Sequence, residues 1–158
     1  MSETPQSPMP PAPAPPASSD GPSGPRASFG RRFVAAFVDG LVLAVIFGIL
    51  FALTNEGVAY GVGILFSLAY FTYFEGSASG QTVGKRALGI RVIDFRTGAP
   101  IGYGRAFIRW IGRILSQIPC YLGYLWMLWD KEKQTWHDKL ANDVVVPVGD
   151  YPVDNWPG

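Results

Sequence analysis

The stretch RRFVAAFVDGLVLAVIFGILFAL, from Arg31 to Leu53, decides how the chain folds. Its last 21 residues, beginning at Phe33, carry a single charged side chain, Asp39. As an α-helix they extend for about 31 Å, enough to cross the hydrocarbon core of a bilayer. A carboxylate at that depth costs about 2.5–3.5 kcal/mol. The sequence therefore predicts a membrane helix in which a partner stabilises Asp39.

A second apolar segment, Val58 to Phe74, follows the short connection Thr54-Asn55-Glu56-Gly57. It has 17 residues and no charge, which is the lower limit for a membrane span. Because so short a connection keeps the two segments adjacent, they are predicted to form an antiparallel hairpin of transmembrane helices. The second helix opens with Gly57-x-x-x-Gly61, a spacing that lets helices approach closely.

The third apolar segment, Phe107 to Trp129, contains Arg109 and Arg113 near its start and Pro119 in its interior. Two interpretations follow. The arginines can extend to the membrane interface while the helix crosses. Alternatively, an amphipathic helix lies in the interface, turns at Pro119 and never crosses.

Between the second and third segments, Leu88 to Phe95 has the composition of a strand, and Arg96-Thr97-Gly98 is typical of a turn before Ala99 to Tyr103. This pattern predicts a β-hairpin, with residues 144–146 (VVV) as a further candidate strand. The predicted fold class is an all-α membrane protein: a transmembrane helix hairpin, a third apolar helix and a small β-hairpin in the cytoplasmic loop.

Composition divides the chain into three parts. Residues 1–28 are rich in proline and poor in large apolar side chains, which predicts a disordered tail. Residues 29–148 form the predicted membrane domain, with apolar segments 33–53, 58–74 and 107–129, and residues 149–158 form a C-terminal tail. Lysines and arginines cluster before the first span and in the loop after the second. By the positive-inside rule, the N-terminus and this loop are cytoplasmic.

The net charge, and the fact that cysteine and histidine each occur once, argue against several functions. A net charge of +1 argues against a nucleic-acid partner, and the charged fraction of 16% lies below the soluble average of about 25%. Cys120 and His137 are the single cysteine and histidine. We therefore expect no metal site, no cofactor and no catalytic set of nucleophile and base, so the protein is predicted not to be an enzyme.

A stripe of small side chains recurs at every fourth residue of the first span, a pattern typical of helix packing in membranes. It consists of Ala36, Gly40, Ala44, Gly48 and Ala52. Asp39 lies about 60° from this stripe on a helix, so its carboxylate is expected to face a packed interior. Two hypotheses remain open: a buried pair with Arg32, Arg109 or Arg113, or a carboxylate that binds a cation or proton during transport.

Three motifs in this order resemble the RDD family, small membrane domains named for one arginine and two aspartates. They are Arg32-x-x-Ala35-x-x-x-Asp39, the segment from Gly80 to Val92 (GQTVGKRALGIRV), and Trp129-Asp130-Lys131 with residues 134–141 (QTWHDKLA). The central and closing motif residues are Gly80, Thr82, Gly84, Lys85, Arg86, Gly89, Asp130, His137 and Asp138. The chain departs from the family where Ala141-Asn142-Asp143 replaces a frequent Ala-Gly-Thr.

The resemblance implies that Arg32 is the family arginine and Asp39 the first aspartate. Asp138 is the preferred second aspartate, with Asp94 and Asp130 as alternatives. About function, the resemblance to this family implies little beyond a suggested role in transport. We therefore expect a multi-pass protein of a bacterial plasma membrane, in contact with lipid and with other subunits or copies of itself. It would serve as an accessory or scaffold subunit or, alternatively, as an oligomeric transporter that uses Asp39.

Overall fold

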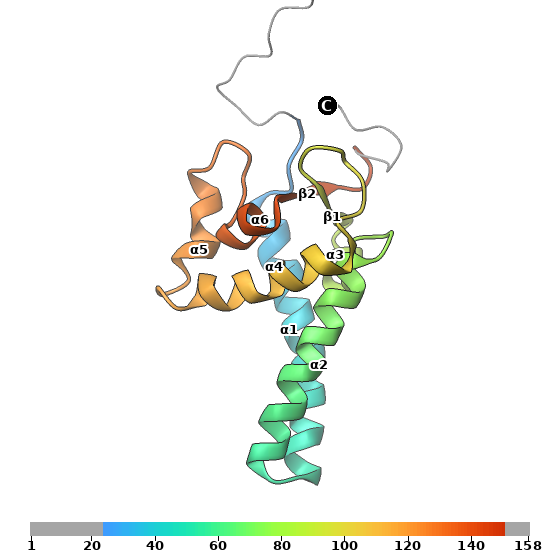
Figure 1. The fold of residues 1–158 in the computed structure, drawn as a ribbon, viewed down its shortest axis with the longest axis vertical. Coiled ribbons are helices and arrows are strands. Elements are labelled where there is room, and N and C mark those ends of the chain that lie inside the picture. Colours follow the sequence, from blue (N-terminus) through green and yellow to red (C-terminus); the bar gives the residue numbers. More distant parts are fainter. Residues whose placement is uncertain (1–23, 151–158) are drawn as a thin grey trace, which may run out of the picture.

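The computed structural model describes residues 24–150, in which two long helices carry a head built from the shorter elements (Figure 1). Helix α1 runs from Phe29 to Leu53 and α2 from Glu56 to Gly76. Ser28 caps α1, and Asn55 caps α2 by accepting a hydrogen bond from the Val58 amide at 3.0 Å. These caps extend both helices beyond the predicted apolar segments. Among the described residues, these two helices are long and apolar enough to cross a membrane.

The remaining elements form the head, at the end of the α1–α2 pair opposite the 54–55 connection (Figure 1). They are α3 (Val83–Ala87), β1 (Ile90–Asp94), α4 (Gly102–Gln117), α5 (Leu122–Leu125), the 3-10 helix η1 (Trp126–Leu128), α6 (Trp136–Ala141) and β2 (Asp143–Pro147). Both ends of the described chain lie in this head. The core of the head is a small apolar cluster that includes Ile90, Val92 and Val145.

The predicted β-hairpin is wrong in its second strand. β1 pairs antiparallel with β2, in a register that places Val92 opposite Val145 and Asp94 opposite Asp143. Residues 99–101 form no strand, because Pro100 lacks an amide hydrogen and Gly102 already begins α4. The further candidate strand at residues 144–146 is the true partner of β1.

The third apolar segment is not one helix. α4 ends at Gln117, and Cys120 and Tyr121 have the left-handed backbone angles φ 49° and 62° before the short α5 begins. α4 lies across the end of the α1–α2 pair (Figure 1), and the chain then returns so that β2 joins β1. The interpretation in which the chain turns near Pro119 therefore fits the structure, and the crossing interpretation does not.

The packed unit begins before Phe29. Ala27 is buried, and its amide donates to the Val145 carbonyl at 2.9 Å. The buried Arg26 side chain forms an ion pair with Glu132 at 2.7 Å. The expected disordered tail, residues 1–28, otherwise lies outside the described residues, as does most of the expected tail 149–158.

Candidate functional site

Asp39 is buried on α1, and its carboxylate faces α2 and the segment that leads into α3. Its Oδ1 accepts hydrogen bonds from the Tyr70 hydroxyl and the Gly84 amide, both at 2.8 Å. Its Oδ2 accepts one from the Thr82 hydroxyl at 2.6 Å. The predicted pairing with an arginine is therefore wrong: within residues 24–150, neutral donors satisfy this carboxylate.

Glycines of the central motif bring these donors to Asp39. A Cβ at Gly84 would overlap the Ala35 carbonyl oxygen and lie 3.0 Å from Asp39 Cγ, so only glycine lets α3 approach α1 this closely. Gly80 has φ +60°, and a Cβ there would meet the backbone of β1. Thr82 caps α3 with the same hydroxyl that donates to Asp39. The motif thus builds a buried connection between α1 and the head.

Charged side chains from α1, α2, α3, α4, α6 and β2 meet in a second buried arrangement, the ionic cluster. Its members are Arg32, Glu75, Lys85, Arg109, Arg113, Asp138 and Asp143. Arg109 lies at its centre and is 1% exposed. The Nη1 atom of Arg109 pairs with both Asp138 and Asp143. Its Nε lies 3.1 Å from Glu75 Oε2. A charge buried this deeply is stable only because several opposite charges surround it.

Glu75 ties three elements together. It is fully buried at the end of α2, and its Oε1 pairs with Lys85 of α3 and with Arg113 of α4. The Arg113 guanidinium also lies 4.0 Å from the centre of the Phe71 ring, a cation–π contact. Glu75 therefore fixes the head onto the end of α2.

Arg32 joins the start of α1 to α6. Its Nη2 donates to Asp138 Oδ2 at 2.6 Å, and its Nη1 donates to the Lys133 carbonyl at 3.1 Å. Asp138 and Thr135 form a capping box at the start of α6, which holds the carboxylate in place. The family arginine and the preferred second aspartate are thus partners of each other.

The two aspartates that share Arg109 differ in their protonation. Burial raises the pKa of Asp143 to about 8; attraction from Arg109 opposes this shift, and repulsion from Asp138 and Glu75 adds to it. Burial acts in the same direction on Asp138, but there Arg109 and Arg32 prevail and hold its pKa well below the usual range. Of the two aspartates that pair with Arg109, Asp143 therefore takes up a proton at a higher pH than Asp138 does.

Two further head groups titrate abnormally. Burial lowers the pKa of Lys85 to about 8, against the attraction of Glu75. Burial also lowers the pKa of His137 well below its usual value, so this histidine is neutral. Its Nδ1 lies 3.3 Å from Ser116 Oγ. Within residues 24–150, no group of three or more His, Cys, Asp or Glu side chains is placed to hold a metal ion.

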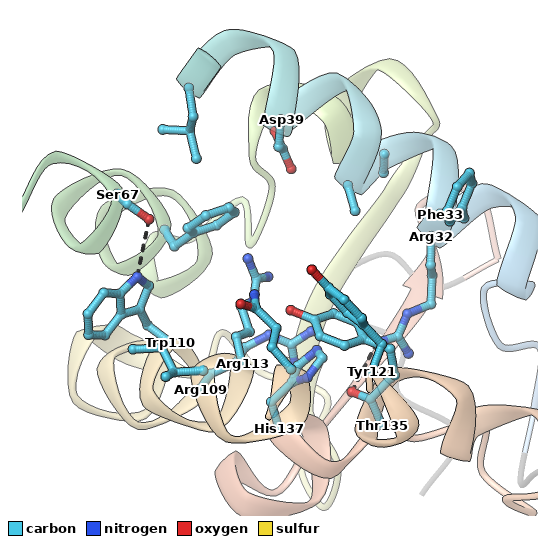
Figure 2. A pocket seen from close by; sticks show the side chains of 18 of the residues that line it. Arg32, Phe33, Asp39, Ser67, Arg109, Trp110, Arg113, Tyr121, Thr135 and His137 are labelled. Atoms are coloured by element: carbon cyan, nitrogen blue, oxygen red, sulfur yellow. Dashed lines mark hydrogen bonds between the residues drawn. The ribbon is translucent and has the colours of Figure 1, made fainter. Parts of the chain in front are cut away.

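A cavity of about 770 Å³ lies between α1, α2 and α4 (Figure 2). Asp39 and Arg32 border it from α1, and Arg109 and Arg113 border it from α4. Trp110 closes one side, where its indole Nε1 donates to Ser67 Oγ of α2 at 3.3 Å. The two polar arrangements therefore share one cavity.

The small-residue stripe does not pack against α2. All five of its residues are exposed, and a Cβ added at Gly40 or Gly48 would meet nothing within 4 Å. The buried positions of α1 are instead Ala35 and Asp39, because the α3 segment covers that face.

Other predicted residues serve local structure. Asp94 accepts hydrogen bonds from the Arg96 and Thr97 amides and pairs with Arg105. Asp130 pairs with Lys139, and its Oδ2 accepts hydrogen bonds from two backbone amides of the loop before α6. The motif residues Arg86 and Gly89 are exposed.

Sequence reasoning missed Glu75, Tyr70 and Asp143 as site residues. Glu75 directly follows an apolar segment, where a carboxylate is ordinarily solvated at a helix end. Tyr70 lies near the end of the second apolar segment, where a tyrosine ordinarily suits the membrane interface. The signal for Asp143 is the departure from the family at residues 141–143, where an acidic residue stands at the start of a buried strand.

The fold and the site define a class: a pair of apolar helices whose polar head is fixed by a buried carboxylate and an ionic cluster. The chain belongs to the RDD family, whose model matches residues 26–142. Members of this family are membrane-associated proteins.

Curated relatives carry general names. A proline-rich antigen homolog of Mycobacterium tuberculosis is 34% identical over 54% of this chain and 35% of its own length. The proline-rich antigen of Mycobacterium leprae is 32% identical over 57% of this chain and 37% of its own length. The chain thus spans about a third of the length of these relatives. An uncharacterized protein of Bacillus subtilis, YxaI, is 28% identical over 76% of this chain and 96% of its own length. No solved structure is significantly similar.

Proposed function

We propose that the chain is a non-enzymatic integral membrane protein that acts as an accessory or scaffold subunit of a membrane assembly. In this proposal α1 and α2 cross a bacterial plasma membrane as an antiparallel pair, and the head lies on the cytoplasmic face. Outward-facing apolar side chains support the crossing: Val45, Leu53 and Leu65 are 65%, 77% and 64% exposed. Lysines and arginines gather at the head, whereas the single charged residue of the 54–57 connection, Glu56, is acidic.

The exposed small-residue stripe is the observation that carries the scaffold role. Because the α1–α2 contact does not use it, Gly48 presents an open surface at which another helix backbone can approach closely. In lipid, such contacts depend on van der Waals packing of small side chains. We expect a second membrane helix, from another subunit or another copy, to dock there.

Crosslinking with mass spectrometry of the detergent-purified full chain tests this role. Gly48→Leu should abolish the assembled species, because the larger side chain separates the two helices. Val45→Leu, a neighbouring exposed position, serves as the control and should leave the species intact. Retention of the assembly in Gly48→Leu would rule out docking on this face.

Reporter fusions test the orientation. A reporter after Glu56 should be found outside the cytoplasm, and one near Arg96 inside it. A reporter after Asp150 should also be cytoplasmic, because β2 pairs with β1. Two reporters on opposite sides at Arg96 and Asp150 would contradict the proposed arrangement.

Asp39 supports a second candidate, transport of a proton or small cation. This carboxylate borders the cavity and, among the described residues, is satisfied by neutral donors rather than by a cation. Two spans enclose no path, so this function requires an oligomer. Ion flux into reconstituted vesicles that Asp39→Asn abolishes would favour it over the scaffold role.

A further inference from the structure

The cavity between α1, α2 and α4 has a cationic end and apolar walls. Arg32, Lys85, Arg109 and Arg113 border it at the end next to the head. Phe33, Leu43, Phe47 and Ile64 are among the apolar side chains that line it along α1 and α2. Such a division matches a ligand with an anionic head and an apolar tail.

The carboxylates that balance these cations leave donors available to the cavity. Glu75, Asp138 and Asp143 belong to the ionic cluster but do not line the cavity. The acidic residue that does, Asp39, already accepts three hydrogen bonds. Four cationic side chains thus border the cavity beside one carboxylate, Asp39, and the three carboxylates of the ionic cluster lie behind them.

Arg113 is the cation best placed to meet a ligand. It projects from α4 into the space that α4 shares with α1 (Figure 2). Its Nη2 pairs with Glu75, whereas its buried Nε has no hydrogen-bond partner among the described residues. A buried donor without a partner is costly, and a phosphate oxygen would satisfy it with a charge-assisted bond.

We propose that this cavity binds the phosphate headgroup of an anionic phospholipid, with an acyl chain lying along α1 and α2. The cavity volume of about 770 Å³ lies within the usual range of small-molecule sites. The inference rests on the proposed membrane insertion of α1 and α2. In that arrangement the cationic end lies beside the head, at the level of the cytoplasmic headgroups, and the apolar walls face the acyl region.

Native mass spectrometry of the full chain in a neutral detergent measures this binding. Dioleoyl phosphatidylglycerol, dioleoyl phosphatidylcholine and inorganic phosphate are titrated separately. We expect phosphatidylglycerol to bind at least tenfold more tightly than phosphatidylcholine, and inorganic phosphate to bind much more weakly than either lipid. Binding of both lipids within twofold, or of phosphate as tightly as phosphatidylglycerol, would overturn the proposal.

Two pairs of variants locate the site. Arg113→Gln should lose the preference for phosphatidylglycerol, while the exposed Arg96→Gln, with the same charge change, should retain it. Gly40→Leu fills the cavity without altering charge and should weaken phosphatidylglycerol binding about tenfold. Gly104→Leu, at an exposed glycine of α4 outside the cavity, should not.

The comparison of Gly40→Leu with Gly104→Leu tests the site even where Arg113→Gln fails to fold. Equal phosphatidylglycerol affinity in both glycine variants would refute the site. A protein that inserts into membranes with the proposed orientation yet shows no lipid preference would refute this inference alone. A protein whose reporters contradict the orientation would refute the proposed function instead.

Discussion

The partnership of Arg32 and Asp138 makes a quantitative prediction. Their side chains are 11% and 0% exposed and lie 2.6 Å apart, so removing either one leaves a buried charge without its closest partner. Breaking a buried pair costs about 3–5 kcal/mol. We expect Asp138→Asn to fall in this range, because it also deprives Arg109 of an ion pair. Arg32→Gln should cost less, about 2–3 kcal/mol, because Arg109 still neutralises Asp138.

The double variant isolates the pair. Since Arg32 and Asp138 are in direct contact, their coupling energy should reach about 1–3 kcal/mol. The matched cycle of Arg32→Gln with Asp39→Asn should show coupling below about 0.5 kcal/mol, because those residues share no partner among the described contacts. The free energy of unfolding of the detergent-purified chain, followed by tryptophan fluorescence, provides all values. Stronger coupling of Arg32 to Asp39 than to Asp138 would refute the assigned pairing.

Three other perturbations test the site. Asp39→Ala leaves three buried donors without an acceptor and should lower the free energy of unfolding by about 3–6 kcal/mol. Asp39→Asn keeps one acceptor oxygen, so it should cost under half as much in the same unfolding measurement. Gly84→Ala should destabilise by about 1–3 kcal/mol through overlap with the backbone of α1, and a neutral effect would contradict the close approach. Because the folded-state pKa of Asp143 is raised from 3.8 to about 8, the folded state binds its proton more tightly, so this group lowers stability as pH rises between those values. Asp143→Asn should remove this dependence of stability on pH, which amounts to at most about 1.4 kcal/mol per pH unit. The variant should also be more stable than the wild type at pH 8. An unchanged dependence on pH would disprove the raised pKa of Asp143.

The two long helices could be predicted because uninterrupted apolar runs of sufficient length specify helices whatever surrounds them. The surroundings of Asp39 could not be predicted in the same way. Helical periodicity gives the direction in which Asp39 points, but Thr82 and Gly84 reach it only because the loop after α2 folds back onto α1. The sequence pattern therefore indicates that the carboxylate is buried, but the arginines that it offers as partners are not the groups that bind it.

The strand pairing failed for a related reason. Turn chemistry at residues 96–98 favours a local hairpin, and the turn does form, with the Asp94 amide donating to the Ala99 carbonyl at 2.8 Å. The buried face of β1, however, requires β-branched side chains opposite it, and residues 144–146 supply them from far along the chain. The choice between a local and a distant partner depends on tertiary packing, which a single sequence does not reveal.

Because β1 pairs with the distant β2, the head can finish folding only after the last described elements have been synthesised. Arg32 leaves the ribosome 106 residues before its partner Asp138, and the closing strand follows later still. The helical pair is therefore complete while the cations of the head still lack two of their carboxylates. A chain terminated before α6 would leave Glu75 as the one cluster carboxylate beside four cations, so the head requires the described residues from Trp136 onward to balance its charges. A truncation or mutation in this last part of the described chain should therefore prevent the head from folding, rather than only removing a peripheral strand.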